Sequence, residues 1–403
     1  MALSIYISVP FCRSKCTYCN FASGVFSAAQ MGAYVERLSA DMRAKRAVAE
    51  ESGAEIPEPV DTIYLGGGTP SLLPPDELKK LFFNLRQEYK VLPKVEITVE
   101  CAPGTITDQI IHTLTTRGVN RVSLGVQSFV DQEAASVARL HTRATVLDDI
   151  ERLRKAGISN INVDLIAGLP HQTRESWEYS LDQAISSGVP HVSVYMLEVD
   201  EDSRLGRELM AGGTRYHAHH VPDDDLTAEF YETACRKLET AGVQQYEISN
   251  FARAGFESLH NLKYWTRQPY LGFGVDAHSM LPASEKLRAQ GTDCVRFATS
   301  DSYDQFLAGP QIAASPVSVE QALEESFFLG LRLNRGISVS ELHQRFGKRM
   351  DAQSLVIEGL VLAGLLSDDG NKIRLTPRGR LLSNEVFEKF IVERQTAISP
   401  PDR

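Results

Sequence analysis

Three cysteines near the start of the chain have the spacing that most clearly indicates chemistry. Cys12, Cys16 and Cys19 form a C-x3-C-x2-C loop, whereas the other three cysteines lie far from it and from one another. A loop of this length can wrap so that three thiolates meet three corners of one iron–sulfur cube, and thiolates are the usual ligands of such clusters. A cube with three protein ligands keeps one iron open for an exchangeable ligand. The spacing therefore predicts a [4Fe–4S] cluster.

Other cysteine sites fit this loop less well. A structural zinc site generally needs four ligands, and no nearby cysteine or histidine completes the set. A thioredoxin-type CxxC would use Cys16 and Cys19 and leave Cys12 without a role. A disulfide framework would be denser and would normally belong to a short secreted chain.

The composition narrows the class of protein. The chain has 403 residues, of which 43% are hydrophobic and 23% charged, and its net charge is −10. An acidic surface repels nucleic-acid phosphates and anionic lipid, so we expect no general nucleic-acid partner. The sequence contains neither a run of about 18 apolar residues nor the pattern of a signal peptide. We therefore expect a cytoplasmic protein.

Strand–helix units follow one another through the first half of the chain and must position the cysteine loop. The predicted strands are residues 4–9, 62–65, 95–99, 121–125, 161–165 and 191–195. The predicted helices between them are residues 28–51, 76–89, 107–116, 145–155 and 174–187. Nearly continuous apolar strands separated by helices indicate an α/β fold with a parallel sheet covered on both faces. Six units favour a partial (β/α)6 barrel with functional residues after the carboxyl ends of its strands.

The pattern changes after the sixth unit. Residues 212–225 read as a loop, residues 225–241 as a helix, and residues 245–248 as a further strand. Three helices at 321–331, 338–346 and 352–363 precede a hairpin with a DG turn at 365–376. This combination predicts a winged-helix-like C-terminal domain. Because the chain has a net negative charge, we expect this domain to pack against the rest of the chain or to dock a partner protein rather than to bind DNA. The expected domains are residues 1–210, 211–310 and 311–403.

The cysteine loop after the first strand resembles the signature of the radical S-adenosylmethionine (SAM) superfamily. The GGGTP run at residues 66–70, which ends the second strand, resembles the family's glycine motif that binds the methionine part of SAM. Residues without side chains let backbone groups approach a small ligand closely. In that family the open iron binds the amino and carboxylate groups of SAM, and an electron from the cluster produces a 5′-deoxyadenosyl radical. The resemblance therefore implies SAM as a second cofactor.

Further polar residues resemble the SAM-contacting set of oxygen-independent coproporphyrinogen III oxidases and their relatives. A carboxylate suits the ribose hydroxyls or amino group of SAM, and an arginine suits its carboxylate. The resemblance implies that SAM contacts Tyr6, Tyr18, Gly67, Gly68, Thr69, Glu100, Gln127, Arg139 and Asp164.

Differences in sequence indicate which branch of this group the chain resembles. The oxidases carry a fourth cysteine two residues after the third, where this chain has Phe21. His260, Asn261, Tyr264 and Trp265 match the H-N-x-x-Y-W motif of the heme-chaperone family HemW. This resemblance implies a chaperone that binds heme and passes it to acceptor proteins, including respiratory enzymes at the membrane, and that exists as a monomer or homodimer.

The residues themselves leave alternatives open. A neutral imidazole of His260 can ligate heme iron, and Tyr264 and Trp265 offer flat apolar surface, but the same motif could simply close the open side of the barrel. The run His217, His219 and His220 is more typical of a solvated loop. The second functional hypothesis is anaerobic oxidative decarboxylation of coproporphyrinogen III, and the third is radical chemistry on an unrelated substrate.

Overall fold

The computed structural model describes residues 2–309 and 312–391 and divides them into two compact units. The first unit comprises the described residues up to Tyr264 and those from Gln268 to Pro316. The second comprises Trp265–Arg267 and the described residues from Val317 onward. The three-part division at residues 210 and 310 stays a prediction, and residues 1, 310–311 and 392–403 of its ranges lie outside the described residues.

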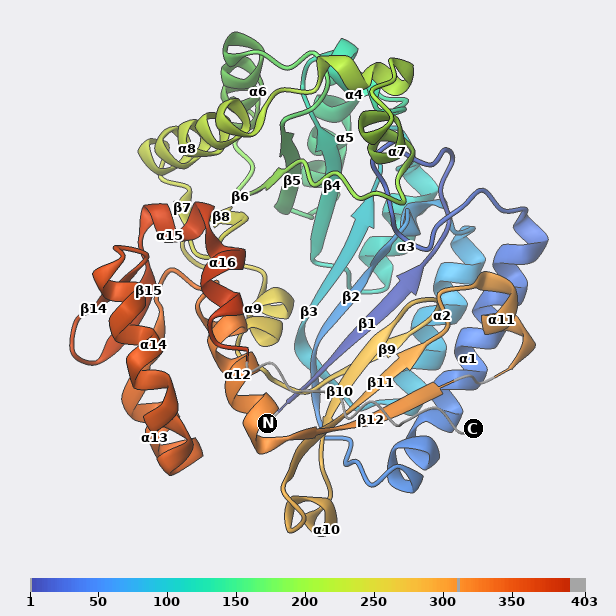
Figure 1. Ribbon diagram of the computed structural model, residues 1–403. Coiled ribbons are helices and arrows are strands. Elements are labelled where there is room, and N and C mark those ends of the chain that lie inside the picture. Colours follow the sequence, from blue (N-terminus) through green and yellow to red (C-terminus); the bar gives the residue numbers. More distant parts are fainter. Residues whose placement is uncertain (1, 310–311, 392–403) are drawn as a thin grey trace, which may run out of the picture. The chain divides into compact units, whose positions relative to one another are not determined.

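A twelve-stranded mixed sheet forms the centre of the first unit in the described part of the chain (Figure 1). Its middle consists of six parallel strands in chain order, which are β1 (Leu3–Val9), β2 (Val60–Gly67), β3 (Val91–Cys101), β4 (Arg121–Gln127), β5 (Asn160–Ala167) and β6 (His191–Met196). These strands coincide with the six predicted ones, and each is longer than predicted by one to four residues at one or both ends. The predicted α/β fold is confirmed.

Side chains alternate between the two faces of these strands, as the two-residue period of a strand requires. Ile5 and Ile7 of β1 are completely buried, and the helices that connect the strands cover this apolar face. The opposite face carries polar side chains such as Tyr6, Ser123 and Asp164. We call this second face the inner face.

The helices of the first unit connect and flank these strands. Several begin with a serine or threonine cap, such as Ser27 before α1 and Thr173 before α6, each of which forms a capping box. The helices are α1 (Ala28–Glu51), α2 (Pro75–Glu88), α3 (Asp108–Thr116), α4 (Asp131–Ser136), α5 (Arg143–Lys155), α6 (Arg174–Ser186), α7 (Arg204–Met210), α8 (Asp224–Thr240), α9 (Leu259–Trp265), α10 (Glu285–Arg288) and α11 (Tyr303–Ala308), with short 3-10 turns η1 (Pro70–Leu72) and η2 (Arg215–His220).

Strands on both sides of the six extend the sheet. Next to β1 lie β9 (Tyr270–Phe273), β10 (His278–Pro282), β11 (Thr292–Thr299) and β12 (Ile312–Ser318), and next to β6 lie β8 (Asn250–Ala252) and β7 (Gln244–Gln245). The predicted strand at 245–248 is wrong in its bounds, because the chain turns at Tyr246–Ser249 and the next strand begins at Asn250. The pairing of β9 with β1 joins segments far apart in the sequence, and no local pattern indicates it.

The second unit is helical with a small sheet, as predicted. Its elements are α12 (Val319–Gly330), α13 (Val339–Phe346), η3 (Gly347–Met350), α14 (Asp351–Leu362), α15 (Pro377–Leu381), α16 (Ser383–Glu388) and the strands β13 (Ile337–Ser338), β14 (Leu366–Asp368) and β15 (Lys372–Leu375). Phe327 and Phe390 stack at its centre with ring centroids 4.3 Å apart. Across the described residues of both units, no helix has the length and apolarity that a membrane crossing requires.

Candidate functional site

The cysteine loop leaves β1 and closes on itself by backbone hydrogen bonds. The N–H of Cys12 donates to Gly24 O at 2.8 Å, and the N–H of Gly24 donates to Pro10 O at 2.9 Å. Within this closed loop, the N–H of Cys19 donates to Cys16 O at 3.3 Å. All three cysteines are free and half-buried. The loop therefore holds three accessible thiols in one small segment at the carboxyl end of β1.

The three thiols lie near one another and near hydroxyl groups. Burial raises the pKa of Cys12, and the neighbouring charges of Cys19 and Cys16 raise it further, whereas hydroxyls of Ser23 and Thr69 oppose the rise. The Thr69 Oγ1 atom lies 3.9 Å from Cys12 Sγ. Thiolates in such surroundings need positive charge, which iron supplies.

No three His, Cys, Asp or Glu side chains among the described residues converge on a single metal ion. A cubane binds each thiolate at a different iron, so its ligands do not converge on one point. The donor set and its half-buried position fit a cluster of this kind.

The glycine run at the end of β2 lies directly against the cysteine loop. The N–H of Gly68 donates to Val9 O at 2.9 Å, and the N–H of Thr69 donates to Phe11 O at 2.7 Å. A Cβ atom on Gly68 would lie 2.7 Å from Val9 O and 2.9 Å from Phe11 N. Gly67 has a left-handed φ of 96°. Only glycine permits this backbone to approach the loop so closely.

Glu100 of β3 lies at the same end of the sheet as the glycine run. Its carboxylate accepts a 2.8 Å hydrogen bond from the Tyr64 hydroxyl and a 3.2 Å hydrogen bond from the Gly67 N–H. Burial raises the pKa of Glu100 to about 7, which Tyr64 and Gly67 partly counteract. Tyr6 stacks on Tyr64 with ring centroids 6.1 Å apart. The carboxylate is thus fixed beside the glycine backbone.

Two side chains at and beyond the end of β4 contain buried atoms without a hydrogen-bond partner in the described part of the chain. Gln127 ends β4 with a left-handed φ of 68°, and its Oε1 atom has no partner. The Nε atom of Arg139 also has none, while its Nη2 atom donates to the Tyr18 hydroxyl at 3.3 Å. Buried polar groups are normally paired. An unpaired amide oxygen and an unpaired guanidinium edge fit contacts to a polar ligand.

Asp164 of β5 completes the polar set on the inner face. Its carboxylate accepts hydrogen bonds from Ser123 at 3.0 Å and from Asn162 at 2.7 Å. Burial raises its pKa, and these hydrogen bonds oppose the rise. The structure therefore brings the cysteine loop, the glycine run and the polar residues predicted for SAM to the carboxyl ends of β1–β5.

The H-N-x-x-Y-W motif begins in α9, and its histidine lies against β2. His260 in α9 is 1% exposed, and its Nδ1 atom lies 3.0 Å from Thr62 Oγ1 near the amino end of β2. Its Nε2 atom lies 2.9 Å from the Tyr264 hydroxyl. Burial lowers the pKa of His260 to about 3, helped by the charges of Lys263 and Arg121. The imidazole is neutral at pH 7, but both of its nitrogens have protein partners.

The other two residues of the motif differ in their surroundings. Asn261 is half-buried, and its backbone N–H donates to Ser258 Oγ at 3.3 Å. Trp265 belongs to the second unit, where the Arg332 guanidinium lies 4.4 Å from the centre of its ring. The ring centroids of His260 and Tyr64 lie 5.2 Å apart, and the Tyr64 hydroxyl donates to Glu100 of the SAM set. The assignment of the four motif residues to heme stays a prediction.

Sequence reasoning missed some residues of the inner face. Arg121, Asn162 and His191 are buried there, and His191 Nδ1 lies 2.6 Å from Asn162 Oδ1. The polar residue at every second position of β4 and β5 is the signal that could have found them. His171 was also missed, and its Nε2 atom lies 3.1 Å from His217 Nδ1 on an exposed loop.

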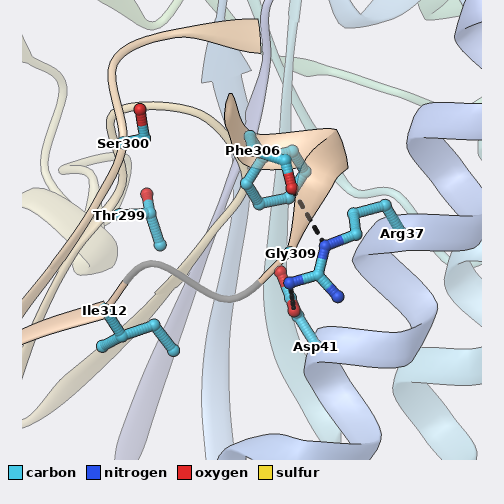
Figure 2. Close-up of a pocket in the computed structure, with 7 residues that line it drawn as sticks. All are labelled: Arg37, Asp41, Thr299, Ser300, Phe306, Gly309 and Ile312. Carbon is cyan, nitrogen blue, oxygen red and sulfur yellow. Dashed lines mark hydrogen bonds and ion pairs between the residues drawn. The ribbon is translucent and has the colours of Figure 1, made fainter. Parts of the chain in front are cut away.

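A small pocket lies away from all predicted site residues. It contains about 200 Å³ of empty space and is lined by Arg37, Asp41, Thr299, Ser300, Phe306, Gly309 and Ile312 (Figure 2). Arg37 donates to Phe306 O at 3.0 Å and pairs with Asp41 at 2.7 Å, so its charge is already satisfied. The space is smaller than a typical ligand pocket. We assign no function to it.

Comparison with known proteins places these features in a family. Residues 6–184 match the radical SAM superfamily, and residues 317–382 match the HemN C-terminal domain. The heme chaperone HemW of Bacillus subtilis is 35% identical over 97% of this chain and 99% of its own length. The heme chaperone HemW of Escherichia coli is 30% identical over 97% of this chain and 98% of its own length.

A solved structure shows the same fold. Coproporphyrinogen III oxidase (HemN) from Escherichia coli superposes with a TM-score of 0.80, covering 96% of this chain and 90% of that chain at 22% identity. Membership of the radical SAM superfamily implies a [4Fe–4S] cluster and SAM. The full-length similarity to several HemW proteins is more specific than the fold. The chain belongs to the HemW family of radical SAM proteins.

Proposed function

We propose that this chain is a heme chaperone that carries a SAM-liganded [4Fe–4S] cluster, binds heme and transfers it to acceptor proteins. The presence of Phe21 is the observation that favours this function over that of an oxidase. It stands where the resembling oxidases have a fourth cysteine, and its side chain is 60% exposed at the end of the cysteine loop. The full-length relatives named heme chaperones support the same conclusion.

The thiolates of Cys12, Cys16 and Cys19 would hold three irons of the cluster. When bound, the cluster with SAM supplies a one-electron source that can cleave the sulfonium bond. The chain's own residues bind and orient SAM in this proposal. The backbone from Gly67 to Thr69 approaches the methionine part, where a side chain on Gly68 would collide with Val9 and Phe11.

Polar side chains around this backbone would hold the remaining groups of SAM. Glu100 is fixed by Tyr64 and by the Gly67 N–H, so its carboxylate is already oriented before SAM arrives. The unpaired edges of Gln127 and Arg139 gain partners when a polar ligand binds. Tyr6, Tyr18 and Asp164 complete the proposed set.

For heme, we propose the motif residues His260, Asn261, Tyr264 and Trp265. His260 is kept neutral, as iron ligation requires. Its Nε2 atom must first leave the Tyr264 hydroxyl, because both nitrogens already have partners. Heme binding through Nε2 therefore needs the Tyr264 side chain to move away from His260.

A histidine substitution tests this assignment. His260→Ala should weaken hemin retention, measured by the Soret band after gel filtration, and leave the cluster absorbance unchanged. His112→Ala is the matched control, because His112 is an exposed histidine outside the motif. Equal hemin retention in both variants and the wild type would remove His260 from the heme site.

The partners of the chain belong to the same proposal. We propose that it works in the cytoplasm, passes heme to acceptors that include respiratory enzymes at the membrane, and forms a homodimer in equilibrium with the monomer. Light scattering at several protein concentrations measures the oligomeric state. Transfer is measured by the appearance of heme in an added apo-acceptor, and no transfer to any heme-free acceptor would contradict the chaperone function.

Oxidation of coproporphyrinogen III is the second candidate function. The intact polar set from Glu100 to Asp164 favours it, because this set resembles that of the oxidases. The test is an anaerobic assay of the reconstituted protein with reductant and SAM. A chaperone should yield no protoporphyrinogen IX and should give a stable Soret band with hemin. Formation of that product would overturn the chaperone assignment.

A further inference from the structure

Arg121, the first residue of β4, is a buried cation without a role in the function proposed above. Its side chain is 2% exposed. It lies two residues before Ser123, whose hydroxyl donates to Asp164, so both side chains belong to the inner face. Thr98 is its direct neighbour in the register of β3 and β4, and Thr98 is completely buried. The sheet therefore places Arg121 and Thr98 side by side in neighbouring strands.

The charge of Arg121 influences groups from several surrounding elements. Burial raises the pKa of Glu96 and of Asp164, and the charge of Arg121 opposes both rises. Burial lowers the pKa of His191 and of His260, and the same charge adds to both shifts. These four groups lie on β3, β5, β6 and α9. The guanidinium thus sits among side chains that meet over the inner face.

None of these groups pairs with Arg121. Within residues 2–309 and 312–391, no hydrogen bond and no ion pair within 4.0 Å involves its side chain, and its Nε atom is buried without a partner. The Glu96 carboxylate accepts hydrogen bonds from two backbone N–H groups at the start of α9, at 3.2 and 3.0 Å. Asp164 is engaged with its neighbours on β4 and β5. Thr98 Oγ1 also has no partner in these residues.

A buried guanidinium stays ionised in proteins, and leaving its charge unpaired is costly. Its planar fork of N–H donors matches the two oxygens of a carboxylate. The adjacent hydroxyl of Thr98 can donate one further hydrogen bond to the same group. Nearby histidines are neutral, and Glu96 and Asp164 accept their hydrogen bonds from other groups, so the N–H donors of Arg121 remain available to an anionic acceptor brought by a ligand.

We propose that Arg121 and Thr98 bind one carboxylate group on the inner face, at a site separate from the SAM contacts. Arg121 and Gln127 begin and end β4, so their backbones lie roughly 20 Å apart at about 3.3 Å per residue. The carboxylate belongs either to a free small acid or to the side arm of a larger molecule. The site itself does not depend on the proposed chaperone function.

Acetate tests whether the carboxylate belongs to a free small acid. The unfolding midpoint of the full-length wild type should rise with acetate and saturate, at constant pH and ionic strength with chloride as the replaced anion. Arg121→Gln should show no dependence on acetate. Arg143→Gln is the matched control, because Arg143 is exposed and hydrogen-bonded to Gln183, and it should behave as the wild type.

Hemin and its dimethyl ester test whether the carboxylate belongs to the side arm of a larger molecule, since the ester lacks both free carboxylates. If acetate has no effect, hemin should raise the midpoint more than the ester does, and the difference should vanish in Arg121→Gln. Arg121→Lys keeps the positive charge without the planar fork of N–H donors, so it should bind the carboxylate several-fold more weakly than the wild type. This variant replaces Arg121→Gln in the test if the glutamine variant does not fold.

The proposal is overturned if neither acetate nor the hemin–ester difference depends on residue 121. The acetate measurement needs neither cluster nor heme, so its failure leaves the chaperone function untouched. Conversely, a wild type that binds no hemin but responds to acetate through Arg121 would contradict the chaperone function and support this site.

Discussion

A methyl group on Gly68 should disrupt SAM binding without unfolding the chain. The added Cβ would lie 2.7 Å from Val9 O and 2.9 Å from both Phe11 N and Phe11 O. All three are backbone atoms at the start of the cysteine loop, so none can rotate away as the end of a long side chain could. The two hydrogen bonds that join this loop to β2 also start from Gly68 and Thr69. The loop and the glycine run must therefore move apart.

The close contacts of the added Cβ atom allow the loss of SAM affinity to be estimated. Forcing one extra methyl group into a tightly packed site costs about 1–3 kcal/mol. If the strain appears as lost SAM affinity, the dissociation constant rises roughly tenfold for each 1.4 kcal/mol. Gly68→Ala should thus weaken SAM binding by about one to two orders of magnitude. The unfolding midpoint of so large a unit should fall by only a few degrees.

The assay compares two glycine variants. Each protein is reconstituted anaerobically with iron and sulfide, and SAM affinity is measured from the change in the EPR signal of the reduced cluster. Gly32→Ala in α1 is the control, because its Cβ would meet only the end of the flexible Glu77 side chain at 3.4 Å. A Gly68→Ala protein with wild-type SAM affinity, or a Gly32→Ala protein equally impaired, would refute the steric reasoning.

Three further substitutions follow from the same contacts. Burial raises the pKa of Glu100 from 4.5 to about 7, so the folded chain holds this proton to higher pH than the unfolded chain does. The free energy of unfolding should therefore fall as the pH rises between these values, by about 3 kcal/mol at most relative to Glu100→Gln. Equal stabilities toward urea at pH 5 and pH 8 would contradict this prediction. Arg139→Lys should weaken SAM binding about tenfold in the EPR titration, because lysine lacks the Nε edge and the planar fork, and unchanged affinity would remove Arg139 from the site. Trp265→Ala should destabilise the second unit by about 2 kcal/mol, because the ring beneath the Arg332 guanidinium is lost. The destabilisation should appear as faster amide hydrogen exchange across residues 317–391, and unchanged exchange there would disprove the prediction.

The features that could be predicted from the sequence are those encoded locally. The three cysteines lie within eight positions, so their spacing alone indicates a shared site. The six parallel strands are rich in apolar residues, and helices of clear period follow the first five. Because parallel strands end at one edge of a sheet, the clustering of Glu100, Gln127 and Asp164 also followed from the pattern.

Contacts between distant segments could not be predicted in the same way. β9 pairs with β1 across more than 260 residues, and no local signal specifies that partner. The surroundings of His260 depend on Thr62 in β2 and on Tyr264 one turn further along α9, so the motif alone did not reveal that both nitrogens have partners. Arg121 reads as an ordinary residue at the start of a strand, and only the folded structure shows that its side chain is buried and that its Nε atom has no hydrogen-bond partner among the described residues.

Mössbauer spectroscopy of the protein reconstituted anaerobically with ⁵⁷Fe tests the central claim most directly. The account predicts the spectrum of a [4Fe–4S] cube in which SAM changes the signal of one iron in four, because three thiolates hold the other three. Replacing Cys12, Cys16 and Cys19 together by serine should abolish the cube. A wild-type spectrum without a cubane, or a cubane that does not respond to SAM, would contradict the account.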